Sequence, residues 1–428
     1  MNHRPSVSPA SPVSSVSSIS PVSVVERFLR YVRFDTQSAE GVDTYPSTAK
    51  QKDLGRQLVA ELRDLGVLDA AIDEHGYVTG TVESNVNAKV PVVGLIAHVD
   101  TSPEVSGADV RPQLHPCYDG GPIALDSEVT LTPEMSPALL AHKGHTIITA
   151  SGTTLLGADD KAGIAEIMTA VERLRADQSI PHGRIRIAFT CDEEVGCGTK
   201  HFDVKQFGAD CAYTVDGENA GEIENETFCA DSATVTFAGI SVHPGFAKGK
   251  LVNAAKVAAR FIGLLPGDMT PETTEDRQGY IHPISVSGGC EKAVVKLILR
   301  DFEEAGLVAQ HKIVAELAEQ ARREFPGSKV TVAGEQSYRN MRYVLDQHPQ
   351  TVEYALEAVR RAGIEPKLAI IRGGTDGARL SYQGLPTPNV FTGGHLFHSR
   401  LEWIAVEDMV AAVDTLVQLV RVWYEKSV

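Results

Sequence analysis

The chain has 428 residues, 43% of them hydrophobic and 22% charged, as is ordinary for a globular protein of two or three domains. Its 40 basic and 56 acidic residues give a net charge of −16, which argues against nucleic acid as a partner because nucleic-acid-binding proteins carry basic patches. No run approaches 18 apolar residues and the six cysteines form no C-x-x-C pair. We therefore expect no membrane-spanning helix, no cysteine zinc site and a cytoplasmic protein with reduced thiols.

Residues 1–21 are rich in Ser and Pro and lack the apolar core of a secretory signal, which predicts a disordered tail. From residue 22 to 231 the chain alternates between helical and strand patterns. Helices are predicted over 22–34, 47–66 and from about 161, and strands over 77–83, 90–100, 184–190 and 211–216, with turns and a short strand within 101–150. This alternation predicts an α/β domain with a mixed sheet flanked by helices on both faces.

The pattern changes between residues 232 and 340. Two-residue alternation over 232–243 is followed by a helix, by two strands around 287–292, by a second helix over 303–325 and by a strand from 329. This order predicts an inserted α+β domain with an antiparallel sheet. The α/β character resumes over 341–428, where the final helix is predicted from residue 406, so the domain containing 22–231 and 341–428 is discontinuous.

Potential metal ligands follow apolar runs of the α/β domain at five places. They are His98 and Asp100; Asp159 and Asp160; Asp192, Glu193 and Glu194; Asp216; and His398. A single acid at a strand end is equally explained by exposure to solvent, but five such segments together favour convergence at the carboxyl edge of the sheet, where α/β proteins bind ligands. Two imidazoles and several carboxylates, without thiolates, suit zinc, cobalt or manganese.

Other hydrolytic or nucleotide-binding motifs are missing from the sequence. It contains no G-x-S-x-G elbow, no H-E-x-x-H pair, and no dinucleotide fingerprint with its downstream acid. The segment HPGFAKGK has the wrong glycine spacing for a phosphate-binding loop, and no Ser or Thr follows its last lysine. These absences leave metal-dependent chemistry as the reading with most support.

The chain resembles the clan of dizinc aminoacylases and carboxypeptidases in six segments: IAHVDTSPEVSG, LLGADDKAGIAEIM, AFTCDEEVG, AYTVDGE, GISVHPGFAKG and IRGGTDGARLS…TGGHLFH. Within that clan it is most similar to the tripeptide aminopeptidases of the peptidase T subgroup, from about residue 22 to 428. The resemblance implies two zinc ions per subunit, with cobalt or manganese as alternatives, and small peptides as substrates. It also implies that residues 232–340 form a lid over the catalytic domain, and that the protein is a homodimer.

The resemblance implies a ligand set for the two zinc ions. His98 and Asp216 would bind one ion, Glu194 and His398 the other, and Asp159 both. The family also has a cis peptide at the position of Asp159–Asp160. The activity implied is hydrolysis of the first peptide bond of a tripeptide by a hydroxide that bridges the two ions.

Three further residues receive catalytic roles from the resemblance. Asp100 would orient His98, Glu193 would act as the general base, and His243 of the lid would stabilise the oxyanion. Four polar residues are candidates for holding the substrate: Asn253, Arg300, Asn340 and Arg372. For each of these four, a structural ion pair or hydrogen bond is an equally good explanation.

Two other functions stay open at this stage. A dipeptidase, carboxypeptidase or N-acyl amino acid deacylase would use the same dizinc core, and dependence on a free amino terminus would separate them. A catalytically silent metal-binding protein is weakened by Glu193, because such a protein has no need of a base beside its ligands. Residues 217–230 depart from the glycine-richer run of the subgroup, which leaves substrate selection there undetermined.

Overall fold

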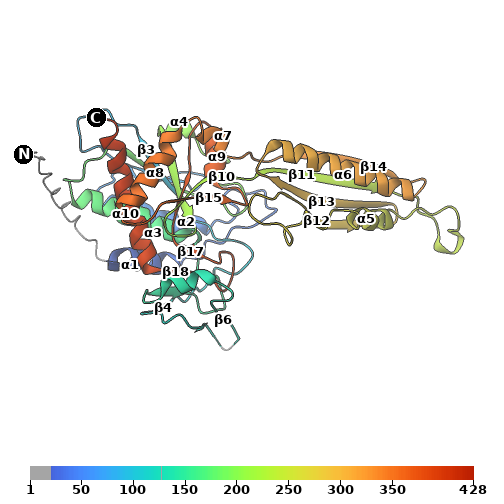
Figure 1. The fold of residues 1–428 in the computed structure, drawn as a ribbon, viewed down its shortest axis with the longest axis horizontal. Coiled ribbons are helices and arrows are strands. Elements are labelled where there is room, and N and C mark those ends of the chain that lie inside the picture. The colour runs from blue at the N-terminus through green and yellow to red at the C-terminus, as the bar shows by residue number, and fades with distance from the viewer. Residues whose placement is uncertain (1–20, 127) are drawn as a thin grey trace, which may run out of the picture.

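The computed structural model describes residues 21–126 and 128–428, so most of the predicted N-terminal tail lies outside the described residues. Figure 1 shows a rounded α/β body and a slender second body that projects from it to one side. The predicted fold class is confirmed: a large mixed sheet flanked by helices, with a separate antiparallel sheet beside it. None of the helices in the described residues is long and apolar enough to cross a membrane.

An eight-stranded mixed sheet forms the centre of the α/β body. Its strands, from edge to edge, are β1 (Ala71–Ile72), β2 (Val78–Val82), β8 (Ile185–Thr190), β3 (Val93–His98), β9 (Cys211–Gly217), β16 (Asn389–Phe391), β10 (Glu222–Thr227) and β15 (Lys367–Ile371). The four neighbours β8, β3, β9 and β16 run parallel. Their carboxyl ends therefore meet at one edge, as the sequence predicted.

Helices cover both faces of this sheet. They are α1 (Pro21–Tyr31), α2 (Gln51–Asp64), α3 (Ala158–Ala176), α4 (Val204–Phe207), α7 (Arg342–Leu345), α8 (Pro349–Arg361), α9 (Asp376–Tyr382) and α10 (Val406–Glu425). Successive side chains of β3 point to opposite faces of the sheet, so Leu95 packs in one apolar cluster and Ile96 in another. A side chain at Gly163 of α3 would collide with the carbonyl oxygen of Val215, so glycine allows the helix to lie directly on β9.

A second, small sheet stands below the body in Figure 1. It consists of β17 (Gly394–His395), β18 (Trp403–Ala405), β7 (Ile147–Thr149) and β4 (Gln113–His115), and it is accompanied by the hairpin of β5 (Ile123–Ala124) with β6 (Thr130–Leu131) and by the 3-10 helix η1 (Pro137–His142). The sequence predicted only one short strand within 101–150. The other strands here are two or three residues long, which is too short for an alternation to be recognised.

The lid is a four-stranded antiparallel sheet with two helices on one face. Its strands lie in the order β12 (Tyr280–Gly288), β13 (Lys292–Asp301), β11 (Cys229–Ala238) and β14 (Lys329–Gln336), and its helices are α5 (Ala254–Ile262) and α6 (Glu304–Glu324). The lid has its own apolar core. The pairing of Cys229 with Asp301 and of Ala238 with Lys292 places residues 239–253 at the end farthest from the body (Figure 1). This loop includes the short 3-10 helix η2 (Pro244–Phe246).

Candidate functional site

The five predicted metal ligands meet at the carboxyl edge of the large sheet. His98 is the last residue of β3, Asp216 lies near the end of β9, and Glu194 follows β8. Asp159 lies at the start of α3, where its backbone dihedral angles are not helical, and His398 follows β17 with a left-handed φ of +59°. A left-handed histidine is uncommon, and such strain is concentrated at functional sites.

The five side chains form two groups of three that share Asp159. In the first group, His98 Nε2 lies 2.9 Å from Asp159 Oδ1 and 3.6 Å from Asp216 Oδ1. In the second, His398 Nε2 lies 2.7 Å from Glu194 Oε2 and 3.2 Å from Asp159 Oδ2. The two oxygens of Asp159 thus face different groups, which is the arrangement of a carboxylate that bridges two cations.

The chemistry of these two groups fits metal ions. Within each group one ligand atom from each residue lies within 4.8 Å of the others. Glu194 Oε1 is buried and has no hydrogen-bond partner among the described residues, although a buried carboxylate oxygen ordinarily has one. Imidazole nitrogens and carboxylate oxygens in this number are ligands for zinc and similar ions.

Asp160 does not belong to the ligand groups although it adjoins Asp159. Its carboxylate accepts hydrogen bonds from the backbone N–H of His98 (3.1 Å) and of Gly163 (3.2 Å). The peptide bond between Asp159 and Asp160 is cis, as the family resemblance implied. Asp192 is likewise directed elsewhere, since it accepts hydrogen bonds from Ser47 and Gln51.

Asp100 lies beneath the site and is fully buried. Its backbone carbonyl lies 3.0 Å from His98 Nδ1, closer than its carboxylate oxygen at 3.5 Å. The carboxylate instead accepts hydrogen bonds from the backbone N–H groups of Glu193 (3.0 Å) and Glu194 (3.2 Å). Asp100 therefore positions both the imidazole of His98 and the segment that carries the two glutamates.

Charge and burial oppose one another in the metal-free site. Burial alone would raise the pKa of Asp159, but hydrogen bonds from His398 and His98 hold it below its usual range. Burial, followed by the charge of Asp159, raises the pKa of Glu194 to about 8. Burial lowers the pKa of His398, but its bonds to Asp159 and Glu194 outweigh this effect and raise it to about 11. Protons thus provide the positive charge that metal ions would supply.

Glu193 belongs to neither of the two ligand groups, although it adjoins Glu194 in sequence. Burial raises its pKa well above the usual range, and the negative charge of Asp376 adds to this effect. Asp376 itself is buried at the start of α9, where Thr190 donates a hydrogen bond to it, and burial raises its pKa to about 7. Sequence reasoning did not single out Asp376.

Glu402 is the other residue that sequence reasoning missed. It is fully buried, and its carboxylate accepts hydrogen bonds from the backbone N–H groups of Leu156 (2.7 Å), Gly157 (2.8 Å) and Asp159 (3.1 Å). It therefore holds the turn that presents the shared carboxylate of Asp159. The only signal in the sequence is an acid within the otherwise apolar segment 401–406.

The structure does not bring His243 to the ligand groups. His243 is exposed in the loop beyond the end of β11, where its Nδ1 accepts a hydrogen bond from the backbone N–H of Gly245. Because the ten residues of β11 lead away from the body, about 30 Å of strand lies between this loop and the start of the lid. The neighbouring Phe246 is 74% exposed.

The four candidate substrate-holding residues make their side-chain hydrogen bonds with residues other than the five metal ligands. Asn253 caps α5 through the N–H of Ala255. The Arg300 guanidinium donates to the backbone carbonyls of Asp231 and Leu299, within the lid. Arg372 donates to Thr274 Oγ1 and to the backbone carbonyls of Asp276 and Gln278, and so connects β15 with the lid.

Asn340 is fully buried between the body and the lid. Its side-chain oxygen accepts from the N–H of Thr227, and its amide donates to Glu226 and to the carbonyl of Phe302. These bonds use both ends of the side chain within the protein. Arg372 and Asn340 thus make structural hydrogen bonds, which is the explanation that the sequence left open beside a role in holding the substrate.

Comparison with known proteins finds relatives along most of the chain. Residues 154–422 match the family described as peptidase family M20/M25/M40. Peptidase T of Bacillus subtilis is 48% identical over 391 residues, which are 91% of this chain and 95% of the relative. The crystal structure of the aminopeptidase PepT from Bacillus cereus is 24% identical with a TM-score of 0.74, and covers 95% of this chain and 99% of its own. A tripeptidase structure from Staphylococcus aureus is 21% identical with a TM-score of 0.75, and covers 96% and 100%.

Proposed function

This chain belongs to peptidase family M20/M25/M40, and from that premise we propose that it is a metal-dependent tripeptide aminopeptidase, which removes the first residue from tripeptides. The observation that carries the proposal is the pair of ligand groups that share Asp159, with the carboxylate of Glu193 near them but in neither group. The relatives named peptidase T, similar over nine-tenths of the chain, support the substrate class.

We propose zinc for both groups, with cobalt or manganese as alternatives. His98 and Asp216 would hold one ion, Glu194 and His398 the other, and Asp159 both. Bound there, two divalent ions polarise the peptide carbonyl and lower the pKa of water. Three ligand carboxylates cannot alone balance four positive charges, so the site keeps an affinity for one further anion.

Glu193 is the proposed general base. It adjoins a ligand in sequence, but it makes no ion pair with either imidazole, and it lies among the carboxylates of Asp376, Asp216 and Glu194. Nearby cations would lower its pKa and free it to take a proton from water and return it to the leaving amine. Asp100 supports this role because it fixes the backbone of Glu193.

The lid is proposed to carry His243 to the oxyanion. Its distance from the site along β11 requires either a rotation of its own lid or a contribution from a second copy of the chain. We propose a homodimer in the cytoplasm, in which the exposed loop of His243 and Phe246 meets the partner. Mixing a His243→Ala chain with a Glu193→Gln chain tests this, because only exchange between copies restores one intact site.

The decisive experiment for the substrate class is product analysis by mass spectrometry. The metal-loaded protein is incubated with a tripeptide, with its N-acetylated form and with the matching dipeptide. Cleavage of the free tripeptide alone, with release of its first residue, is the expected result. Equal cleavage of the dipeptide or of the blocked peptide would instead assign the chain to the dipeptidases, carboxypeptidases or deacylases that share the dizinc core.

A further inference from the structure

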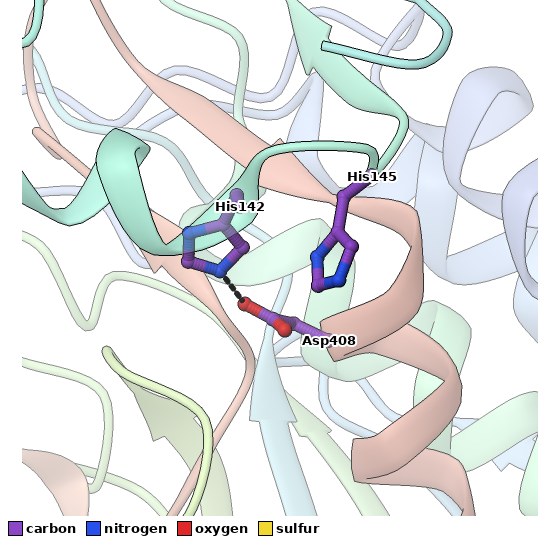
Figure 2. A group of neighbouring side chains, drawn as sticks. All are labelled: His142, His145 and Asp408. Carbon is purple, nitrogen blue, oxygen red and sulfur yellow. Dashed lines mark hydrogen bonds and ion pairs between the residues drawn. The ribbon is translucent and has the colours of Figure 1, made fainter. Parts of the chain in front are cut away.

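A third cluster of metal-binding side chains lies outside the candidate active site. His142 ends η1, His145 follows three residues later, and Asp408 lies in the first turn of α10. Figure 2 shows that the three side chains converge from these two segments. One ligand atom of each lies within 4.8 Å of the others, which is the same closeness found in the two groups of the active site. None of these residues has a part in the proposed reaction.

The hydrogen bonds of His142 prepare one of its nitrogens for a cation. Its Nδ1 lies 2.9 Å from the carbonyl oxygen of Ala138, and only a protonated Nδ1 can donate to that oxygen. In the neutral imidazole the lone pair of Nε2 then faces Asp408 Oδ2 at 2.7 Å. Two acceptors at this distance have a proton between them in the metal-free chain. A zinc ion would take the place of that proton after the two atoms move to about 3.3 Å apart, the separation of tetrahedral zinc ligands.

His98 of the candidate active site has the same arrangement. There Nδ1 lies 3.0 Å from a backbone carbonyl, that of Asp100, and Nε2 lies 2.9 Å from a carboxylate oxygen of Asp159. Histidine ligands of metal ions commonly donate their second N–H to a backbone carbonyl, which fixes the ring and its tautomer. His142 therefore has both the nearby carboxylate and the backbone partner of a ligand.

His145 supplies the observation that a proton does not explain. Its Nδ1 is buried, yet it has no hydrogen-bond partner among the described residues. Its ring lies edge-on to that of His142, with centroids 5.3 Å apart. An ion pair between His142 and Asp408 would leave this buried nitrogen without a bond, whereas a shared cation would coordinate it.

We propose that His142, His145 and Asp408 bind one divalent transition-metal ion, zinc in the first instance, which fastens the segment 137–145 to α10. Two imidazoles and one carboxylate are a known donor set for zinc, and water completes the tetrahedron. The side chain of His142 is 12% exposed, so the ion can enter from solvent. We assign the ion a structural role from its position, because it would join the segment beside the small sheet to α10.

The surroundings of the cluster are compatible with a cation. The neighbouring imidazole of His395 is buried. The ring of His395 stacks on Trp403 at 4.1 Å, and the ring of His142 meets Trp403 edge-on. Glu407, next to Asp408, is occupied by the backbone N–H of Thr146.

Metal counting on matched variants tests the proposal. Wild type, His145→Gln and the control His115→Gln are stripped with chelator and dialysed against zinc, and bound zinc is measured by mass spectrometry. His115 bonds Thr149 in the same small sheet and belongs to none of the ligand groups. We expect His145→Gln to bind one zinc fewer than wild type and His115→Gln to bind the same number. This difference does not depend on how many ions the active site holds.

A crystallographic measurement covers the case in which the variant does not fold. Wild-type crystals grown with zinc should give an anomalous peak at the zinc absorption edge between His142, His145 and Asp408. Equal zinc content in wild type and His145→Gln, or the absence of this peak in zinc-loaded crystals, would overturn the proposal. Either result would leave the hydrogen bond between His142 and Asp408 as the only hydrogen bond among these three described residues.

Discussion

Replacing Glu402 tests whether the hydrogen bonds that its carboxylate accepts from the backbone hold the shared ligand Asp159 in place. The carboxylate of Glu402 accepts three backbone N–H bonds, from Leu156, Gly157 and Asp159. Glutamine has the same shape, but its amide group would face the N–H of Asp159 as a second donor. Glu402→Gln therefore removes one bond and leaves the other two in place, whereas Glu402→Ala removes all three.

The magnitude follows from the charge and burial of this contact. A hydrogen bond to a charged acceptor contributes about 1.5–3 kcal/mol, so Glu402→Gln should cost about 2 kcal/mol. If the lost hydrogen bond leaves the carboxylate of Asp159 less well positioned, zinc affinity should fall by about 10–100-fold, the effect usual for partners of metal ligands. Glu402→Ala leaves three N–H groups unpaired and should lower the free energy of unfolding by about 3–5 kcal/mol.

The assay is zinc titration at pH 8, followed by competition with a chelator, together with thermal melting of the metal-free chains. Burial raises the pKa of Glu402 to about 7, so its carboxylate is mostly ionised at that pH. Glu407→Gln is the matched control, because Glu407, near the start of α10, also accepts from a backbone N–H, that of Thr146, but its side chain is exposed. Wild-type zinc affinity in Glu402→Gln would refute the reasoning, as would an equal loss in Glu407→Gln.

Three other predictions concern the site and its surroundings. Glu193→Gln should lower kcat by about 100-fold to 10,000-fold with the metal content unchanged, whereas Glu194→Gln should lose metal; loss of metal in both variants would contradict this division of roles. Removal of metal should lower the melting temperature, because each ion present at 100 times its dissociation constant adds about 2.7 kcal/mol, and identical calorimetric transitions with and without chelator would contradict a preformed metal site. Burial, followed by the charge of Asp408, raises the pKa of Glu166 well above 4.5, so the folded chain retains a proton that the unfolded chain releases above that pH. Its contribution to stability therefore decreases with rising pH, by up to about 1.4 kcal/mol per unit, and Glu166→Gln should melt progressively higher than wild type from pH 5 to pH 8.

The order of strands and helices, and the meeting of the ligands, could be predicted because they depend on local patterns. His98 and Asp216 each end an apolar run, and parallel strands place such ends side by side. The two-residue alternation of β11 and the apolar face of α6 likewise indicated the lid. The strands of the small sheet could not be predicted, since two or three residues contain no period and their pairing is decided by distant partners.

Glu402 and the His142 cluster could not be predicted for a related reason. Glu402 acts on backbone N–H groups about 245 residues earlier in the chain, and no side-chain motif marks a backbone partner. His142 and Asp408 are 266 residues apart. Arg372 shows the opposite difficulty, because an arginine after an apolar strand looks the same in sequence whether it meets a peptide carboxylate or, as here, the carbonyls of Asp276 and Gln278.

The position of β16 has a consequence for how the protein is made. This strand comes from residues 389–391, yet it lies between β9 and β10, which precede the lid in the chain. The lid occupies one continuous stretch, so a growing chain completes it while the large sheet still has an open edge at β9. His398 leaves the ribosome later still. A chain that stops before that residue therefore has a folded lid but an incomplete ligand set, and we expect peptide hydrolysis to begin only after His398 has been synthesised.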